Sequence, residues 1–423
     1  MISRIQVLHY RALKYIDVKL SNFLILVGPN ASGKSTFLDV INLIKDVLNE
    51  SPRAAVEKRA SRFDELLWRK EGNKFEIAID IEIPPDIQGK LKDKEFCLVR
   101  YEISLQSDNQ KGVLIGGENL WLIKTISTNP QNYLNKQKGQ MILFPREPEE
   151  PASVFSPPRK TPAGWRKIIS KSAQGNDYFR SETTDWNIIY KFGPVKASLA
   201  RMPEDEERFP VSLWIKNILL EGIQFLQLNS GMMRWPCRPD LPVAFQTDGS
   251  NLPKVVQYLK REQPNSFTRW VKHIQTALPE IKKIEVKEKA EDRFLYLNIQ
   301  HKNGSELPSW VISDGTLRLL AQTIIAYLPE KNQFYMIEEP ENGLHPLAIE
   351  SVYQSLSSLY DNQILLATHS PAILRLAEPK HILCFSKTES GAVDIVRGED
   401  HPKLRDWKRD IDISTLHAAG VLQ

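Results

Sequence analysis

The spacing of apolar residues divides the N-terminal part of the chain into strands and one helix. Residues 2–20 alternate between apolar and polar positions, as strands with one buried face do. The apolar run Phe23–Val27 is continuous, which is typical of a strand buried on both faces. Residues 36–48 then carry apolar side chains at helical spacing. This order predicts a buried strand, a glycine-containing loop and a helix.

An antiparallel sheet is predicted to follow. Residues 75–83 and 96–105 alternate as strands, and residues 113–126 predict two more strands around a Gly-Gly turn. Composition changes after about residue 126, because residues 129–210 are rich in proline, lysine and arginine. The proline-dense stretch 144–162 fits neither a regular helix nor a central strand. We therefore expect an inserted, partly extended surface region.

Helix and strand signals return in the second half. Helical periodicity covers residues 211–223 and 252–278, and two apolar strands are predicted at 334–339 and 363–368. A strand pair at 281–302 leads into a helix. The whole pattern predicts an α/β fold with a mixed sheet core and an antiparallel β lobe. Its segments are 1–126, an insertion and helical region at 127–279, and 280–423 with a short tail.

Residues 28–35 read GPNASGKS and fit the phosphate-binding pattern G-x-x-x-x-G-K-[ST]. A buried strand precedes them and a helix follows, so a plain glycine turn is a poor explanation. Backbone N–H groups of such a loop close around phosphate oxygens, and the helix N-terminus adds positive potential. Lys34 would reach the β- and γ-phosphates, and the Ser35 hydroxyl would ligate Mg²⁺. The predicted ATP contacts are Gly28, Pro29, Asn30, Ala31, Ser32, Gly33, Lys34, Ser35 and Thr36.

Two carboxylates end the predicted strand at 334–339. We assign Glu338 to Mg²⁺ and Glu339 to the general base that polarises the attacking water. Alone, such a pair would be two solvated glutamates at a strand end. Together with the phosphate loop it predicts a catalytic site.

A third motif, ISDGTLR at 312–318, opens a helix just upstream of the acidic strand. By itself it would be an ordinary N-capped helix. Its position makes it similar to the signature loop of ABC-type ATPases. The resemblance implies that Ser313, Asp314 and Gly315 contact the γ-phosphate of ATP on the opposite protomer. Two ATP molecules would then be enclosed in a symmetric homodimer.

The same resemblance assigns further residues. His369, after an apolar strand, matches the family's switch histidine, which senses the γ-phosphate and orients water. Asn342 lies where the family's D-loop crosses the dimer, and Arg11 is a candidate phosphate contact or a surface arginine. The glutamine loop that ligates Mg²⁺ in many ABC ATPases has no assignment, since Asp64–Trp68 contains no glutamine.

The resemblance to ABC-type ATPases covers two blocks, residues 1–125 and 280–390. Two further motifs indicate a narrower group within that family. PENGLHP at 340–346 and DGSNLP at 248–253 are similar to bacterial RecF/SMC-related ATPases. These include the overcoming-lysogenization-defect type and the ATPase subunits of anti-phage systems. The implied function is an ATPase head that gates a DNA-directed or anti-phage activity, with a nuclease or toxin as partner. The tail at 370–423 is too short for a separate nuclease domain, so another chain would supply cleavage.

Two other functions stay open. The chain could be a non-catalytic, ATP-dependent scaffold or sensor that holds a toxin or nuclease. It could also be a transporter ATPase subunit, although the separated motif blocks and the unassigned glutamine loop argue against this.

Composition adds little to these alternatives. With 56 basic and 52 acidic residues the net charge is +4, too balanced to mark a nucleic-acid binder. DNA remains a candidate ligand of a basic and aromatic segment, which suits a protein-binding or disordered loop equally well. Its residues are Phe155, Arg159, Lys160, Trp165, Arg166, Lys167 and Lys171.

The chain shows no sign of membrane insertion or of an oxidising compartment. No stretch approaches the roughly 20 apolar residues of a transmembrane helix, and the N-terminus has no apolar signal core. The three cysteines lie far apart and form no metal-type spacing. We expect a cytoplasmic protein with no membrane partner.

Overall fold

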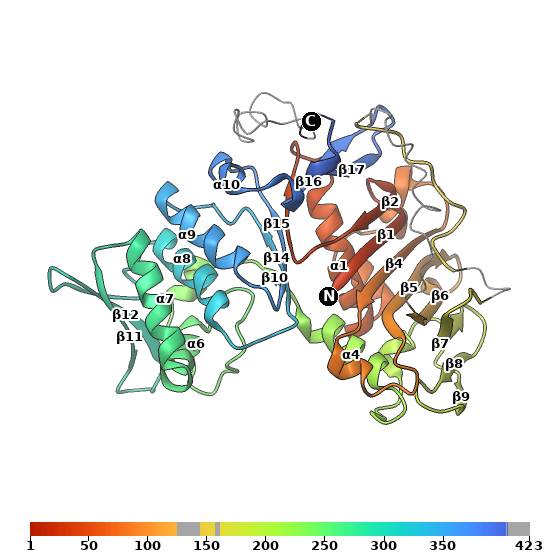
Figure 1. Ribbon diagram of the computed structural model, residues 1–423, viewed down its shortest axis with the longest axis horizontal. Helices are drawn as coiled ribbons and strands as arrows, with labels where there is room; N and C mark the ends of the chain where they lie inside the picture. The colour runs from red at the N-terminus through yellow and green to blue at the C-terminus, as the bar shows by residue number, and fades with distance from the viewer. Residues whose placement is uncertain (125–143, 157–160, 403, 405–423) are drawn as a thin grey trace.

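A computed structural model describes residues 1–124, 144–156, 161–402 and 404. Two lobes flank a central sheet (Figure 1). The strands β1, β2 and β4–β9 form one lobe, and the helices α6–α9 with the strands β11 and β12 form the other. This is the α/β arrangement that the sequence predicts.

The central sheet has six strands in the order β10-β14-β15-β3-β16-β17. Its first five strands are parallel, and β17 runs antiparallel to β16. The carboxyl ends of β3, β14 and β15 therefore lie at one edge of the sheet, where ligand sites of parallel sheets form. The strands are β10 (Ile223–Leu226), β14 (Phe334–Glu338), β15 (Gln363–Ala367), β3 (Phe23–Val27), β16 (Ile382–Lys387) and β17 (Val393–Arg397).

The second sheet has eight antiparallel strands in the order β2-β1-β4-β5-β6-β7-β8-β9. The last three come from the region predicted as an irregular insertion, so its described part extends the β lobe. Short strands with polar alternation, preceded by many prolines, give a weak strand signal. The strands are β2 (Leu13–Lys19), β1 (Ile2–Tyr10), β4 (Lys74–Glu82), β5 (Phe96–Asp108), β6 (Gly112–Lys124), β7 (Trp165–Ser172), β8 (Asp177–Arg180) and β9 (Asn187–Tyr190).

The prediction of two strands around the Gly-Gly pair is wrong, because β6 is one continuous strand. Ser104 of β5 pairs with Gly117, whereas the next residue, Leu105, pairs with Ile115. Gly116 is thus the extra residue of a β-bulge. A glycine pair suits a bulge as well as a turn, and only the pairing with β5 distinguishes the two.

Helix α1 (Lys34–Asn49) lies between the two sheets. The molecule has two large hydrophobic cores among the described residues, and β3 contributes side chains to both. Leu24 and Leu26 of β3 join the core that contains α1 and the antiparallel sheet. Phe23, Ile25 and Val27 face the other side, in the core of the helical lobe. Both faces of β3 are buried, which explains its uninterrupted apolar sequence.

The helical lobe covers the other face of the central sheet with α6 (Leu252–Glu262), α7 (Pro264–Ala277), α8 (Asp314–Ile324) and α9 (Pro346–Ser357). A three-stranded sheet joins them, made of β11 (Ile281–Glu288), β12 (Leu295–His301) and β13 (Glu306–Pro308). The predicted helix at 252–278 is two helices. Gln263 has a non-helical backbone conformation, and Pro264, which has no N–H to continue α6, begins α7.

The predicted helix at 211–223 is confirmed to within one residue, but its last turn is π-helical. It comprises α4 (Pro210–Asn217) and a π-helical turn at Ile218–Gly222, after which β10 begins. The remaining α-helices among the described residues are α2 (Pro52–Glu57), α3 (Pro85–Gln88), α5 (Ser230–Arg234) and α10 (Pro371–Leu376). Within this described part, every helix is too short or too polar to cross a bilayer.

Candidate functional site

The predicted phosphate loop, acidic pair and histidine meet in one cleft of about 620 Å³. Residues 30–36, Glu338, Glu339 and His369 all line this cleft. The register explains the meeting, because Leu26 pairs with Ala367 of β15 and Glu338 pairs with the same residue. Motifs that are far apart in sequence thus follow neighbouring parallel strands.

The phosphate loop needs glycine where it enters α1. Gly33 has φ +101°, and a Cβ there would lie 2.6 Å from the Val393 side chain. Ala31 also has a positive φ of 61°. The loop is therefore held in a conformation that few sequences adopt, with its backbone close around the space that the cleft leaves.

Lys34 and Ser32 give this loop its chemistry. The Lys34 Nζ donates hydrogen bonds to the Gly28 and Pro29 carbonyl oxygens, each at 2.8 Å. Burial lowers the Lys34 pKa to about 8, against the opposing effect of Glu338 and Glu339. The Lys34 ammonium uses two of its three N–H donors in its bonds to the loop carbonyls, and the buried Ser32 hydroxyl has no partner among the described residues. Both groups could bind an anionic phosphate in this glycine loop.

The acidic pair leaves its strand by an unusual turn. Glu339 has φ 46°, and its N–H donates to the Ala367 carbonyl at 2.8 Å. The Asn342 Nδ2 donates to the Glu339 Oε2 at 2.5 Å. Left-handed backbone at a non-glycine residue is costly and persists only where the surroundings enforce it. Asn342 thus lies in the cleft of its own chain and bonds to Glu339, while its expected place where the D-loop crosses a dimer stays a prediction.

Glu341, which the sequence analysis left without a role, ties the acidic loop to the histidine loop. Its Oε1 accepts from the Thr368 Oγ1 at 2.7 Å and from the His369 N–H at 3.2 Å. Burial lowers the His369 pKa, and nearby Lys34 lowers it further, against Glu339 and Glu341. A neutral imidazole therefore faces the cleft at neutral pH.

The donor set fits a hard divalent cation held together with phosphate. Ser35 and Glu338 both line the cleft, and hydroxyl and carboxylate oxygens are ligands that Mg²⁺ prefers. Within the described part of the chain, no group of three or more His, Cys, Asp or Glu side chains could hold a metal. Mg²⁺ usually takes one or two protein ligands and completes its shell with phosphate and water, and Ser35 and Glu338 could supply these two.

Comparison with known families decides the classification. Residues 23–375 match the family described as "AAA domain, putative AbiEii toxin, Type IV TA system". This chain belongs to that AAA-domain family. The matched range contains the phosphate loop, the signature motif, the acidic pair and the histidine.

The AAA-domain protein is also similar to a curated protein and to solved structures. It is 32% identical over 91 residues to "Old nuclease" from Escherichia phage P2, a match that covers 19% of this chain and 16% of that protein. The chain therefore matches about a sixth of that relative's length.

Two solved SMC heads have the same fold. The structure of the SmcHead bound to the C-winged helix domain of ScpA has a TM-score of 0.52 at 14% identity, covering 93% of this chain and 96% of that chain. An Smc head domain with an extended coiled coil, bound to the C-terminal domain of ScpA derived from Pyrococcus furiosus, has a TM-score of 0.51 at 13% identity. That match covers 97% and 99% of the two chains. At this identity the likeness shows an SMC-type, ABC-like head fold.

The signature loop of the AAA-domain protein lies outside the cleft of its own chain. Ser313 caps α8 by accepting from the Thr316 N–H at 3.2 Å, and Asp314 forms an ion pair with Arg234. None of Ser313, Asp314 and Gly315 is among the residues that line the cleft. A Cβ at Gly315 would lie 2.4 Å from the Gly343 carbonyl oxygen, so the signature loop packs directly on the loop after Glu339.

A glutamine beside the acidic pair was missed in the sequence. Leu226, the last residue of β10, pairs with Ile337, which places Gln227 beside Glu338. Gln227, Glu338 and Glu339 line a second hollow of about 200 Å³. The run Ile223–Leu226 with a glutamine after it was a signal, but helical periodicity upstream concealed it.

Arg11 lines the cleft, but its contacts point to a supporting role. Its guanidinium donates to the Arg59 carbonyl oxygen at 2.9 Å and lies 3.6 Å from the Asp39 carboxylate. These bonds link the β1–β2 turn to α1 and its neighbourhood.

Most of the predicted basic segment does not form a cationic surface. Lys171 is buried in an ion pair with Asp177 at 2.6 Å, and Arg166 donates to the Ser181 and Thr184 carbonyl oxygens. Lys167 lies over the ring of buried Trp121. Arg159 and Lys160 lie outside the described residues, and Trp165 packs edge-on against Trp121.

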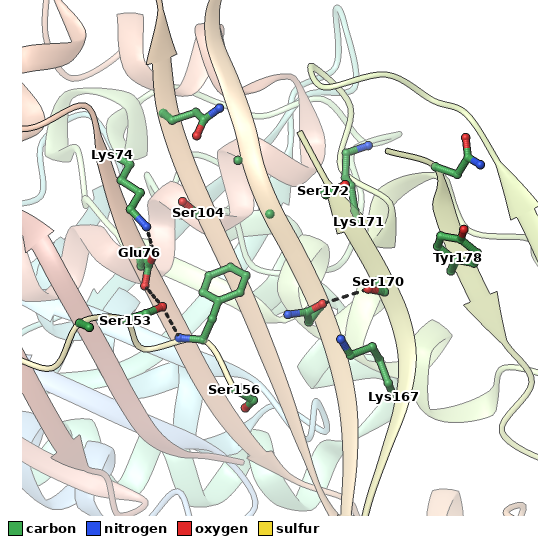
Figure 2. Close-up of a pocket in the computed structure, with 17 residues that line it drawn as sticks. Lys74, Glu76, Ser104, Ser153, Ser156, Lys167, Ser170, Lys171, Ser172 and Tyr178 are labelled. Carbon is green, nitrogen blue, oxygen red and sulfur yellow. Dashed lines mark hydrogen bonds and ion pairs between the residues drawn. The ribbon is translucent and has the colours of Figure 1, made fainter. Parts of the chain in front are cut away.

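The segment instead borders a cleft of about 690 Å³ on the outer face of the antiparallel sheet. Figure 2 shows serines and lysines from neighbouring strands around it, with Lys74 bonded to Glu76. Phe155 lies against the backbone of Gly117. In the described part of this cleft Lys74 and Lys171 are already paired with carboxylates, so these two side chains are not free to bind phosphate, and DNA binding by the segment stays a prediction.

Proposed function

We propose that this protein binds ATP with Mg²⁺ in the cleft beside the phosphate loop and hydrolyses it when two copies enclose the nucleotides. One observation carries the proposal. A single chain gathers the phosphate loop, acidic pair and histidine, but its signature loop does not line that cleft. A second copy would complete each site with its own Ser313 and Gly315, as a two-fold dimer allows.

The roles of the residues follow from their contacts. Residues 30–36, which include Lys34, hold the phosphates. Ser35 and Glu338 hold Mg²⁺, and Gln227 lies beside Glu338. When bound, Mg²⁺ would neutralise the phosphate charge. Glu339 accepts the proton of the attacking water, while Asn342 fixes its carboxylate. His369 donates or accepts a hydrogen bond at the γ-phosphate side, and Glu341 positions it.

We further propose that the ATPase cycle gates a partner effector, a nuclease or a toxin, in anti-phage defence or DNA repair. The family description names a putative toxin of a type IV toxin–antitoxin system, and the curated relative is a phage nuclease. Both support an effector-linked role. The scaffold alternative shares every structural feature and differs only in whether turnover matters.

The test uses Lys34→Ala and Glu339→Gln. We expect the parent to hydrolyse ATP slowly, Lys34→Ala to lose ATP binding, and Glu339→Gln to bind ATP and accumulate as a dimer. A Glu339→Gln variant that hydrolyses at the parent rate would remove the base assignment. If Glu339→Gln keeps biological activity that Lys34→Ala loses, ATP binding alone is sufficient and the scaffold function is correct.

A further inference from the structure

Exposed apolar side chains concentrate beside the signature loop. Among nine large hydrophobic residues exposed in the described chain, Met232, Trp235, Trp310 and Val311 are neighbours of this loop. Their exposed fractions are 47%, 72%, 49% and 59%. We call these residues the signature patch. Exposed tryptophan and methionine side chains grouped in this way mark interaction sites more often than plain surface.

Specific bonds make the signature patch one rigid surface. The Arg234 side chain of α5 donates to the Ile312 carbonyl oxygen at 3.2 Å, and the Ser309 Oγ donates to the Arg234 carbonyl oxygen at 2.9 Å. The Arg234 guanidinium also pairs with Asp314. Met232 and Trp235 lie within two residues of Arg234, and Trp310 and Val311 lie between Ser309 and Ile312, so both halves are joined to the same loop.

Trp310 is held in place by a second contact. Its ring lies 5.0 Å from the Tyr296 ring of β12. A rigid aromatic side chain loses little conformational entropy on binding, which suits an interface anchor.

The signature patch is continuous with the nucleotide cleft. Gly315 packs on Gly343, and the preceding residue, Asn342, lines the cleft and bonds to Glu339. A surface therefore runs from the acidic pair, over the signature loop, to Trp235 and Trp310. The polar signature residues lie inside it and the apolar residues beside them.

We propose that the signature patch is the apolar anchor on which a second copy of this chain docks, beside the mouth of that copy's nucleotide cleft. The inference rests on the proposed function and names the side chains that hold the dimer. In a two-fold dimer, any surface that brings Ser313 to the partner's phosphates brings the signature patch to the rim of the same cleft. Exposed Lys387 lines that cleft, and its ammonium is a cation of the kind that packs on indole rings.

Dimer formation tests the proposal directly. In the Glu339→Gln background with ATP, we expect the double substitution Trp235→Ser and Trp310→Ser to weaken dimerisation about tenfold or more, as measured by analytical ultracentrifugation. Monomer ATP affinity and thermal unfolding should stay at parent values. The matched control is Tyr360→Ser, at 79% exposed the most exposed of these nine residues. It lies at the opposite end of the parallel strands, where its carbonyl bonds to Asn22 before β3.

The outcomes separate the two proposals. If Glu339→Gln itself stays monomeric with ATP, the enclosed-nucleotide dimer is wrong and the inference falls with it. If that parent dimerises and the tryptophan variant dimerises equally well, the signature patch does not hold the second copy. A tryptophan variant that dimerises normally but no longer binds an effector would assign the patch to the effector and overturn the inference.

Mixing two inactive chains adds a test of action between copies. Lys34→Ala has an intact signature patch and no nucleotide, whereas the tryptophan variant has nucleotide and no patch. In a mixed dimer, the first chain's patch meets the second chain's ATP, so one of two sites is complete. A one-to-one mixture should show more ATPase activity than the separate variants, up to the quarter of the parent activity that unimpaired random pairing would give. No recovery above the separate variants would contradict docking between copies.

Discussion

Glu341 offers a sharp test of how the acidic loop controls the histidine. Glu341→Ala removes the acceptor of both the Thr368 hydroxyl and the His369 N–H. Thr368 is fully buried, so its hydroxyl would lose its partner without access to water. A hydrogen bond to a carboxylate contributes about 1.5–3 kcal/mol, and Glu341 is half-buried, so we take about 2 kcal/mol for the pair. That energy corresponds to roughly thirtyfold in rate.

The expected loss appears in kcat, because no phosphate-loop residue touches Glu341 in the described contacts. The affinity for ATP, measured with the variant under non-hydrolysing conditions, should stay at the parent value. Glu341→Gln should recover much of kcat, since one oxygen accepts both bonds and an amide keeps that oxygen. Glu350→Ala, which removes an exposed carboxylate of α9, is the control. A Glu341→Ala enzyme with parental kcat, or with only a raised KM, would refute this coupling.

Two further predictions concern charge in buried places. Burial lowers the Lys34 pKa to about 8, so the amine of the nucleotide-free protein loses its charge as pH rises through that value, and ATP affinity should fall between pH 7 and pH 9. Calorimetry checks this, and Lys34→Arg, which stays charged, should bind equally at both pH values. Lys171→Met should destabilise the fold by about 3 kcal/mol, because it leaves buried Asp177 without its cation. Thermal unfolding should show this loss, whereas half-buried Lys167→Met should change stability little, and equal effects would contradict the buried-pair argument.

The motifs that sequence could place are those that depend on local structure. The phosphate loop, the acidic pair and His369 each follow a short apolar strand, and parallel strands bring such ends to one edge. The continuous apolar sequence of β3 also reports directly that both faces are buried. For these elements, the sequence of a few neighbouring residues is enough to predict the structure.

Features that depend on distant partners were beyond the sequence. The Gly116–Gly117 pair is a bulge because of its register with β5. Lys171 is buried because β8 supplies Asp177, although its sequence neighbours suggest a solvated basic patch. Asn342 turns toward Glu339 because Glu339 leaves its strand with a positive φ, which no propensity predicts. Each of these outcomes is decided by a contact between segments far apart or by enforced backbone strain.

The contacts of the loop after Glu339 indicate that the two sites of the proposed dimer would act together. Asn342 bonds to the proposed base, Glu339, in its own cleft, and the adjacent Gly343 touches Gly315, whose signature loop would serve the partner's nucleotide in that dimer. The separation is one residue of backbone, and Glu341 on the other side reaches the histidine loop. A shift of this loop on hydrolysis would therefore move the base and histidine of one site and the signature contact of the other. Because Gly315 leaves no space for a side chain against the Gly343 carbonyl, such a shift cannot be absorbed between them. In the proposed dimer, close packing at this point would make one-sided hydrolysis and dimer opening parts of the same movement.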